Sequence, residues 1–384
     1  MNKLLKKRNY IHNPDNGGTE GVNILKKQPQ PKPQPSTSMK IFKYEAPFEL
    51  ENGAVLPKIQ IAYHTYGSMN AKGDNVVWIC HALTGNSEAA DWWSGLVGDG
   101  KYLDPQAHFI VCANVLGSHY GSTSPLSINP KTGRFYGRDF PTISIRDSVK
   151  AHHLLAQSLD IQSINWGIGG SMGGQQILEW AIIEPDFFKN IAVIACGAKM
   201  TPWSIALNET QRMAIEADPS VSRENVAKTK DLGKLQSLGM KGMEAARAIG
   251  MLSYRSYEGY NFAQKDDRDL LDTFKVQSYQ RYQGQKLAQR FNALSYLSLT
   301  KTMDSHNVGR NRGGIETALQ NIKTNTLVVG IQSDILFPLE EQVELAKQIP
   351  NAQLEVIQSK FGHDGFLIEF DQMLALLQKF LRNT

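Results

Sequence analysis

The sequence predicts an α/β protein with a mostly parallel sheet, helices on both faces of that sheet, and one inserted helical segment. Three observations lead to this prediction. Short, continuously apolar runs recur along the chain, as in strands that are buried on both faces. Segments with helical spacing alternate with these runs, which indicates parallel strands joined by helices. A long stretch without strand-like runs then interrupts the alternation.

The first 38 residues differ in composition from the rest of the chain. They are polar, and they end in the proline- and glutamine-rich run 28–38. Alternating prolines favour an extended polyproline conformation that builds no core. We therefore predict that residues 1–38 form a tail outside the folded part.

Predicted elements follow in order from residue 40. Residues 40–50 and 55–66 form a hairpin in this prediction, because Asn52-Gly53 between them supplies the positive φ angles of a tight turn. Apolar runs predict strands at 76–80, 109–115, 164–168, 190–196, 326–332 and 353–358. Helical spacing predicts helices at 144–159, after Ser171 up to Pro185, at 339–348 and at 366–381.

The alternation breaks at about Ala198 and resumes after about Asn321. Between these points the chain has helical periodicity and many polar residues. We predict a helical lid at 199–322, inserted into a core that consists of 39–198 and 323–384.

Composition and charge exclude several classes of protein. The net charge is +4, and much of the excess lies in the first 32 residues, so the body is close to neutral and nucleic-acid binding is not expected. Cys80, Cys112 and Cys196 lie in apolar runs without metal-ligand spacing, so we expect buried free thiols, a reducing compartment and no metal site. No run of eighteen apolar residues is present, so we expect no membrane span and a cytoplasmic protein.

A glycine-rich junction at residues 169–173 is the first candidate for chemistry. The run Gly169-Gly170-Ser171-Met172-Gly173 directly follows an apolar strand and directly precedes a helix. Such a strand–turn–helix setting presents a serine hydroxyl at the apex of a strained turn, as a nucleophile elbow does. A phosphate-binding loop would need Gly-Lys-Ser/Thr at its end, and that is absent from this stretch.

Candidate partners for Ser171 lie after two later strands. A serine needs a base and a carboxylate that fixes the tautomer of the base, and in this kind of site the partners follow in the order Asp/Glu, then His. Asp334 follows the strand at 326–332, and His363 lies in a turn after the strand at 353–358. His306 is the other downstream histidine, but it lies inside the predicted lid. We predict the triad Ser171, Asp334 and His363.

An oxyanion hole should combine two backbone N–H groups. One belongs to Met172, directly after the serine, and the other to the loop after the strand at 76–80. Leu83 is the preferred donor in that loop, with Ala82 and Thr84 as alternatives. His81 precedes the loop, and we expect it to brace the loop by hydrogen bonding.

Two charged residues suggest an amino acid as the acyl acceptor. Arg212 shares a helical face with isoleucines in the predicted lid, and Asp364 directly follows the base. An amino acid carries a carboxylate, which Arg212 can bind through two hydrogen bonds, and an ammonium group, which Asp364 can bind.

From about residue 40 onward the sequence resembles the homoserine O-acetyltransferase family, acyltransferases of the α/β-hydrolase fold in methionine biosynthesis. The matching motifs are His81-Ala-Leu-Thr-Gly-Asn86, Gly121-Ser-Thr, Ser127-Ile-Asn-Pro-Lys-Thr-Gly133, Thr142-Ile-Ser-Ile-Arg-Asp147, Gly169-Gly-Ser-Met-Gly-Gly174, Asn208-Glu209, Arg212, Asp218-Pro219, Gln277-Ser-Tyr-Gln-Arg-Tyr-Gln-Gly284, Arg290-Phe-Asn, Tyr296-Leu-Ser-Leu-Thr-Lys301, Ser333-Asp334 and Gly362-His363-Asp364. The sequence departs from the family pattern in residues 220–223 and 196–203.

This resemblance implies a mechanism and a set of partners. It implies an acetyl group moved from acetyl-CoA, as a co-substrate, to L-homoserine through an acyl-serine on Ser171. It also implies no permanently bound cofactor, Arg212 and Asp364 as homoserine contacts, and a homodimer that forms through the lid. Succinyl-CoA as donor, serine as acceptor, or simple carboxylester hydrolysis remain alternatives on the same scaffold.

Overall fold

An eight-stranded, mostly parallel sheet forms the centre of the computed structural model, which describes residues 38–383. The strand order is β1-β4-β6-β5-β9-β10-β11-β12. The strands are β1 (Lys40–Tyr44), β4 (Ile59–Tyr66), β5 (Val76–Cys80), β6 (Phe109–Ala113), β9 (Ile164–Gly170), β10 (Phe188–Ile194), β11 (Asn325–Ile331) and β12 (Ala352–Ile357). Only the pairs β1–β4 and β4–β6 are antiparallel, and the other neighbouring strands are parallel. The predicted fold class is confirmed.

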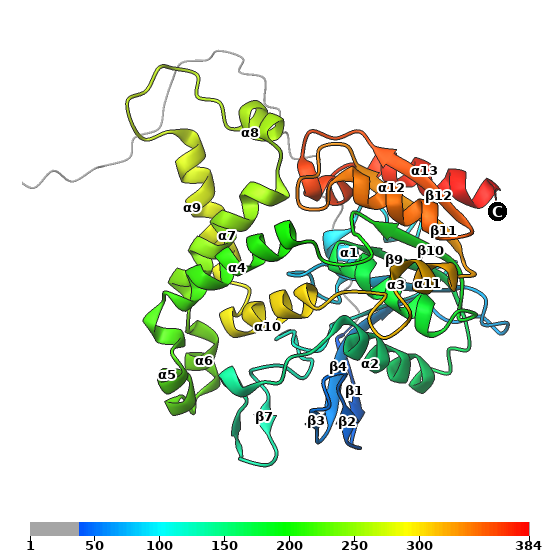
Figure 1. Ribbon diagram of the computed structural model, residues 1–384, viewed down its shortest axis with the longest axis horizontal. Helices are drawn as coiled ribbons and strands as arrows, with labels where there is room; N and C mark the ends of the chain where they lie inside the picture. Colours follow the sequence, from blue (N-terminus) through cyan, green and yellow to red (C-terminus); the bar gives the residue numbers. More distant parts are fainter. Residues whose placement is uncertain (1–37, 384) are drawn as a thin grey trace, which may run out of the picture. The chain divides into compact units, whose positions relative to one another are not determined.

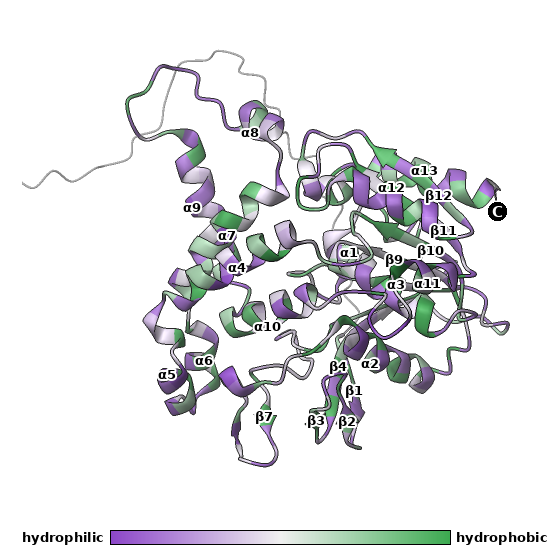
Figure 2. Cartoon of the chain, in the orientation of Figure 1, coloured by the Kyte–Doolittle hydropathy of each residue, from purple (hydrophilic) through white to green (hydrophobic). Residues whose placement is uncertain are grey.

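Both faces of the sheet are covered, and this explains the continuously apolar strands. Trp78 and Val77 are neighbours on β5, and both are completely buried, in two different core clusters on opposite faces. One cluster includes side chains from α2 (Ile145–Ser158), α3 (Met172–Ile183) and α12 (Leu339–Gln348). The other includes side chains from α13 (Phe370–Asn383) and from the loop after α1 (Ala89–Trp92). Figure 2 shows the resulting concentration of hydrophobic residues along the strands.

All regular structure between β10 and β11 is helical, as predicted, and we call this part the helical insertion. It contains α4 (Pro202–Glu216), η2 (Pro219–Val221), α5 (Arg223–Lys228), α6 (Leu232–Ser237), α7 (Met240–Tyr254), α8 (Tyr257–Ala263), α9 (Lys275–Ala288), α10 (Ala293–Asp304) and α11 (Ile315–Gln320). Most of its helices, drawn in green and yellow in Figure 1, lie to one side of the central sheet. The limits 199–322 of a separate lid stay a prediction.

Several smaller elements complete the fold. The predicted turn at Asn52-Gly53 joins β2 (Phe48–Glu49) to β3 (Val55–Leu56), with Gly53 at a φ of 83°. A second short hairpin consists of β7 (Ile128–Asn129) and β8 (Arg134–Phe135), followed by η1 (Gly137–Asp139), and the sequence did not suggest it. The tail predicted for residues 1–38 lies outside the described residues, except for Ser38.

The predicted final helix begins later than expected. Instead of starting at residue 366, the chain first forms the short 3-10 helix η3 (Gly362–Leu367), and α13 begins at Phe370. Gly362, with a φ of 67°, opens this tighter segment. In residues 38–383, no helix has the length and apolar character needed to cross a membrane.

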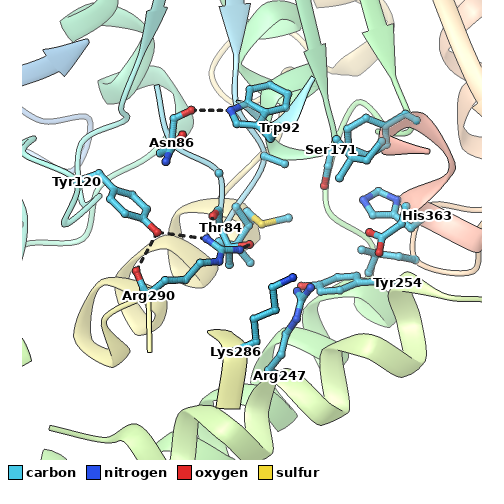
Figure 3. Close-up of a pocket in the computed structure, with 18 of the residues that line it drawn as sticks. Thr84, Asn86, Trp92, Tyr120, Ser171, Arg247, Tyr254, Lys286, Arg290 and His363 are labelled. Carbon is cyan, nitrogen blue, oxygen red and sulfur yellow. Dashed lines mark hydrogen bonds between the residues drawn. The ribbon is translucent and has the colours of Figure 1, made fainter. Parts of the chain in front are cut away.

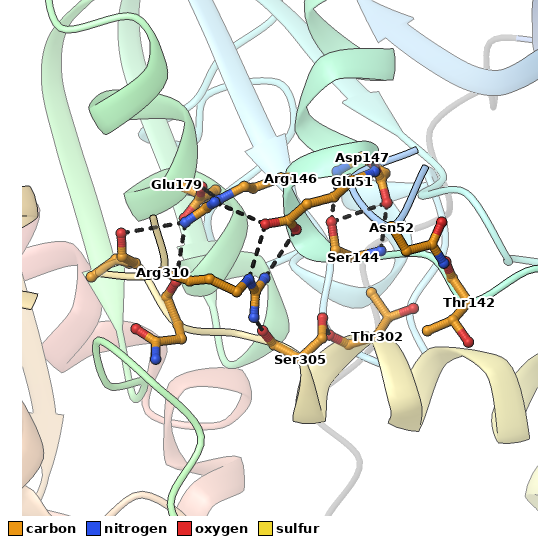
Figure 4. A network of polar contacts seen from close by, with 12 residues as sticks. Glu51, Asn52, Thr142, Ser144, Arg146, Asp147, Glu179, Thr302, Ser305 and Arg310 are labelled. Carbon is orange, nitrogen blue, oxygen red and sulfur yellow. Dashed lines mark hydrogen bonds and ion pairs between the residues drawn. The ribbon is translucent and has the colours of Figure 1, made fainter. Parts of the chain in front are cut away.

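A buried network of ion pairs connects the helical insertion to the helix that follows Ser171 (Figure 4). Glu179 on α3 pairs with Arg146 on α2 and, at 2.7 Å, with Arg312 from the loop after α10. Arg310 in the same loop pairs with Glu51 at 2.9 Å, and Glu51 also accepts from Arg146 at 2.8 Å. Burial raises the pKa of Glu179, and the two arginines oppose this effect. The network therefore fixes α3 from the side that faces the insertion.

Candidate active site

Ser171 occupies a strained turn between β9 and α3. Its φ of 56° and ψ of −125° lie in a region that residues other than glycine rarely adopt, at a cost of about 1–3 kcal/mol. The surrounding glycines are required by space. A Cβ on Gly169 would lie 2.2 Å from Gly173 O, and a Cβ on Gly173 would lie 2.1 Å from Cys80 O. The local structure therefore has the predicted geometry, a strand, a strained turn with Ser171 at its apex, and a helix.

His363 and Asp334 form a buried pair after neighbouring strands. His363 lies in η3, after β12, and Asp334 lies in the turn after β11. His363 Nδ1 and Asp334 Oδ2 are 2.6 Å apart, while Oδ1 accepts from the N–H groups of Leu336 at 2.8 Å and Phe337 at 3.0 Å. Burial disfavours the charged imidazole, but the charge of Asp334, its hydrogen bond to the ring and the charge of Asp364 together outweigh this effect and raise the pKa of His363. The carboxylate thus orients the ring and leaves Nε2 for chemistry.

Ser171 and His363 line the same cavity, whose volume is about 430 Å³ (Figure 3). Asp334 lies behind the imidazole, so the three predicted triad residues are brought together. Within the described residues, Ser171 Oγ makes no hydrogen bond to another side chain. Catalytic hydrogen bonds are often long before a substrate binds, so this geometry is compatible with a triad.

The loop after β5 forms one wall of the cavity. Ala82, Leu83 and Thr84 all line it, as does Ser171, which directly precedes α3; the first N–H groups of that helix have no partner within the helix. His81 braces this loop as predicted, because its Nδ1 donates to Ala82 O at 2.8 Å and its Nε2 accepts from Val115 N–H at 3.2 Å. Burial lowers the pKa of His81 to about 4, so the ring is neutral.

Arg212 does not line the cavity. The helical-face argument was right that its side chain is buried, but the guanidinium faces two carboxylates of the protein itself. Arg212 Nη2 lies 2.6 Å from both Glu209 Oε2 and Asp304 Oδ2. Because these partners already satisfy its charge, the geometry contradicts the expectation that Arg212 contacts a substrate. Asn208, on the same helix as Arg212, does line the cavity, and its side-chain amide donates a hydrogen bond to the Asp304 carboxylate.

Arg247 on α7 occupies the position that was expected for Arg212. It lines the cavity, with its guanidinium carbon 5.1 Å from the centre of the Tyr254 ring. No carboxylate of residues 38–383 lies within ion-pair distance of it. The sequence offered the same kind of indication as for Arg212, since Arg247 stands between Ala246 and Ala248 in an apolar helical stretch.

Further charged groups line the cavity. Asp364 is one of them, and its Oδ2 lies 3.3 Å from Arg255 Nη2, while its contact with a substrate stays a prediction. Lys286 and Arg290, from α9 and the turn after it, were not anticipated as cavity residues. Across the part of the chain that the structure describes, no group of three or more His, Cys, Asp or Glu side chains is arranged to hold a metal ion.

Comparison with known proteins gives the family. Residues 75–370 match the family model of the alpha/beta hydrolase fold. Over 344 residues the chain is 47% identical to a homoserine O-acetyltransferase of Cyclobacterium marinum. This alignment covers 89% of this chain and 95% of that protein. The chain belongs to the homoserine O-acetyltransferase family. Ser171, Asp334, His363 and the loop after β5 fall within the matched part.

Solved structures agree with this fold. The homoserine O-acetyltransferase from Bacillus anthracis has a TM-score of 0.79 at 24% identity, covering 90% of this chain and 97% of that chain. Esterase E22 also has a TM-score of 0.79, at 22% identity, covering 90% and 99%. Proteins named as a transferase and as an esterase therefore share the fold of the homoserine O-acetyltransferase family, and the backbone alone does not separate the two activities.

Proposed function

We propose that this chain is a homoserine O-acetyltransferase, which moves the acetyl group of acetyl-CoA to the hydroxyl of L-homoserine through an acetyl-Ser171 intermediate. One observation carries the proposal. A candidate nucleophile and its base share a cavity with an arginine that lacks a carboxylate partner among the described residues and with a carboxylate, Arg247 and Asp364. This combination suits an amino acid bound close to an acyl-serine.

The first half-reaction forms the acyl-enzyme. His363 takes the proton of Ser171 Oγ, and the oxygen attacks the thioester carbonyl of acetyl-CoA. The N–H groups of Met172 and of Leu83 donate hydrogen bonds to the oxyanion of the tetrahedral intermediate. Removal of one such donor typically raises the activation free energy by about 3 kcal/mol. His363 then gives its proton to the departing CoA thiolate, and the raised pKa of its ring favours holding that proton in the meantime.

The second half-reaction transfers the acetyl group. We propose that Arg247, in place of Arg212, binds the homoserine carboxylate, and that Asp364 binds the ammonium group. His363 deprotonates the side-chain hydroxyl, which attacks the acetyl carbonyl, and Ser171 leaves as the free hydroxyl. Since both half-reactions use one site, ping-pong kinetics are expected.

Exclusion of water distinguishes this transfer from ester hydrolysis. We propose that the helical insertion, with limits near 199 and 322, acts as the lid that shields the acetyl-serine. The acetyl-serine then reacts with homoserine in preference to water, because Arg247 and Asp364 hold the homoserine hydroxyl at the reacting carbon and so raise its effective concentration there.

A succinyl donor is the second candidate, and one observation favours it. A succinyl group carries a carboxylate, and the cavity contains Lys286 as an additional cation without a carboxylate partner among the described residues. Because the Lys286 side chain is exposed, we assign it instead to the phosphates of the CoA moiety on the solvent side of the cavity.

The remaining features of the proposal concern assembly and location. Large apolar side chains are exposed along the insertion, at Trp203, Met213, Leu232, Leu252, Tyr257, Phe262, Leu271 and Tyr282. They support a homodimer formed through the insertion, which sedimentation can test. The free, buried thiols support a reducing compartment such as the cytoplasm. We propose no permanently bound cofactor and small molecules as the substrates.

A thiol-release assay tests the function directly. Acetyl-CoA and succinyl-CoA are each combined with homoserine and with serine, and free CoA is measured for the wild type and for Ser171→Ala. We expect repeated turnover with acetyl-CoA and homoserine only. When the acceptor is omitted, we expect one CoA released per enzyme and a gain of one acetyl mass on Ser171. Equal release without any acceptor would indicate a hydrolase, and the absence of the mass gain would exclude the acyl-enzyme.

A further inference from the structure

The turn that carries the proposed second oxyanion donor is held from two directions. On the core side, Gly85 N–H donates to Ala82 O at 2.8 Å, and His81 donates to the same carbonyl. On the opposite side, Arg290 Nη1 donates to Thr84 O at 2.7 Å. Among residues 38–383, no side chain other than Arg290 is hydrogen-bonded to the Leu83–Thr84 segment. The centre of the turn is thus attached to the helical insertion by one guanidinium.

Arg290 is itself firmly placed. It lies in the turn between α9 and α10, where its backbone carbonyl accepts from Tyr120 Oη at 2.8 Å and from His119 Nε2 at 3.1 Å. Tyr120 Oη also accepts from Arg290 Nη1 at 3.2 Å (Figure 3). The rings of His119, Tyr120 and Phe291 pack against one another. This support determines where the guanidinium points.

A carboxylate partner for Arg290 is missing from the described part of the chain, and this distinguishes it from Arg212. The guanidinium of Arg212 is neutralised by two acidic groups, whereas that of Arg290 is bonded to a carbonyl and a hydroxyl. The hydrogen bonds of the Arg290 guanidinium therefore go to the loop after β5 and to Tyr120, and not to an acidic side chain that would neutralise its charge. A peptide carbonyl held in this way restricts rotation of the neighbouring peptide planes, because each plane is rigid.

We propose that Arg290 is a positioning residue for the oxyanion hole, which holds Thr84 O outward so that an N–H group of the turn faces Ser171 Oγ. This inference rests on the proposed function, which assigns the hole to this turn. Oxyanion donors act only when they are close to the final position of the oxygen, so a loosely held turn would lose rate and keep substrate affinity. Because Arg290 belongs to the insertion, a shift of the insertion relative to the core would also move this turn and change the position of its N–H groups relative to Ser171.

The test uses p-nitrophenyl acetate, whose attack by Ser171 needs the oxyanion hole but neither CoA nor homoserine. Arg290→Ala should lower the kcat for release of p-nitrophenol by about 10- to 100-fold, less than the full loss of one donor, with KM nearly unchanged. Millimolar guanidinium ion should restore much of the rate. Arg290→Lys keeps the charge but lacks the planar fork, so it should recover only part of the activity. Arg281→Ala, which removes an exposed cation from the preceding helix α9, is the matched control and should behave as wild type.

Each result decides the question. A rate for Arg290→Ala equal to that of Arg281→Ala, a change confined to KM, or a loss that guanidinium ion does not restore would overturn the proposal. If Arg290→Ala does not fold, Tyr120→Phe removes the hydroxyl that supports the guanidinium and should lower kcat in the same direction by a smaller factor. An incorrect donor or acceptor would show in the CoA thiol-release assay and would leave the aryl acetate result unaffected.

Discussion

Replacing Arg247 by alanine should impair the second half-reaction and leave the first intact. The guanidinium lines the same cavity as Ser171, and no acidic side chain in residues 38–383 pairs with it. Two charge-assisted hydrogen bonds to a substrate carboxylate would therefore be lost, at a net cost of about 2–4 kcal/mol. This corresponds to a decrease of roughly 30- to 1,000-fold in kcat/KM for homoserine. Acetylation of Ser171 by acetyl-CoA does not involve that carboxylate.

The two half-reactions can be measured separately. Thiol release in a single turnover without acceptor reports acetylation, and steady-state kinetics with homoserine report transfer. Arg212→Ala is the matched comparison, since it removes an arginine from the same insertion. It leaves Asp304 and Glu209 without a cation, so we expect reduced thermal stability and a small effect on kcat/KM. The reasoning is refuted if Arg212→Ala abolishes homoserine turnover while Arg247→Ala retains it.

Further outcomes follow from the triad, the buried network and the histidines. Asp334→Asn should lower kcat by about 10⁴-fold, because the amide favours the wrong tautomer of His363, and circular dichroism should show an unchanged fold. Arg312→Ala removes one of the two arginines that pair with Glu179, and chemical denaturation should show a loss of about 3 kcal/mol, whereas Glu179→Gln combined with it should recover part of this. Burial lowers the pKa of His152 to about 3, so the folded ring stays neutral while the unfolded chain binds a proton below pH ~6.5. Above pH ~6.5 the ring is neutral in both states and does not affect the free energy of unfolding. Between pH ~6.5 and ~3 the free energy of unfolding falls by about 1.4 kcal/mol for each unit by which the pH is lowered. His152→Phe should remove that part of the slope in denaturation curves measured at several pH values.

The arrangement of Ser171, Asp334 and His363 could be predicted because it depends on strand ends. The glycines around Ser171 are imposed by backbone contacts across the elbow, and a pattern of small residues records such contacts directly in the sequence. Asp334 and His363 follow β11 and β12, which are parallel neighbours, so their carboxyl ends lie at one edge. Chain order then suggested the roles that we propose for them. These relations are local or belong to the topology, and a single sequence contains both.

The substrate contacts could not be predicted with the same reliability. Helical spacing shows that Arg212 and Arg247 both face inward, but it does not show what lies opposite each of them. Arg212 meets Asp304, which belongs to a different helix, whereas Arg247 meets open cavity. Side-chain pairing between distant helices depends on how those helices cross, and the helical period contains no information about the crossing. The same reasoning explains why Arg290 was noticed only as part of a motif.

The insertion contacts the core next to both functional loops, and this offers a physical reason why one backbone can serve different acyl chemistry. Arg290 holds the turn that faces Ser171 on one side, while Arg255, just after α7, pairs with Asp364 beside the base. Ser256, the next residue, donates to Lys360 O in the loop before His363. A substitution in the insertion can therefore shift the proposed oxyanion donor or the proposed base without altering the sheet. Esterase E22 shares this fold, so the fold alone does not determine the acyl acceptor, and the contacts of the insertion with the two loops are where we expect that choice to be made.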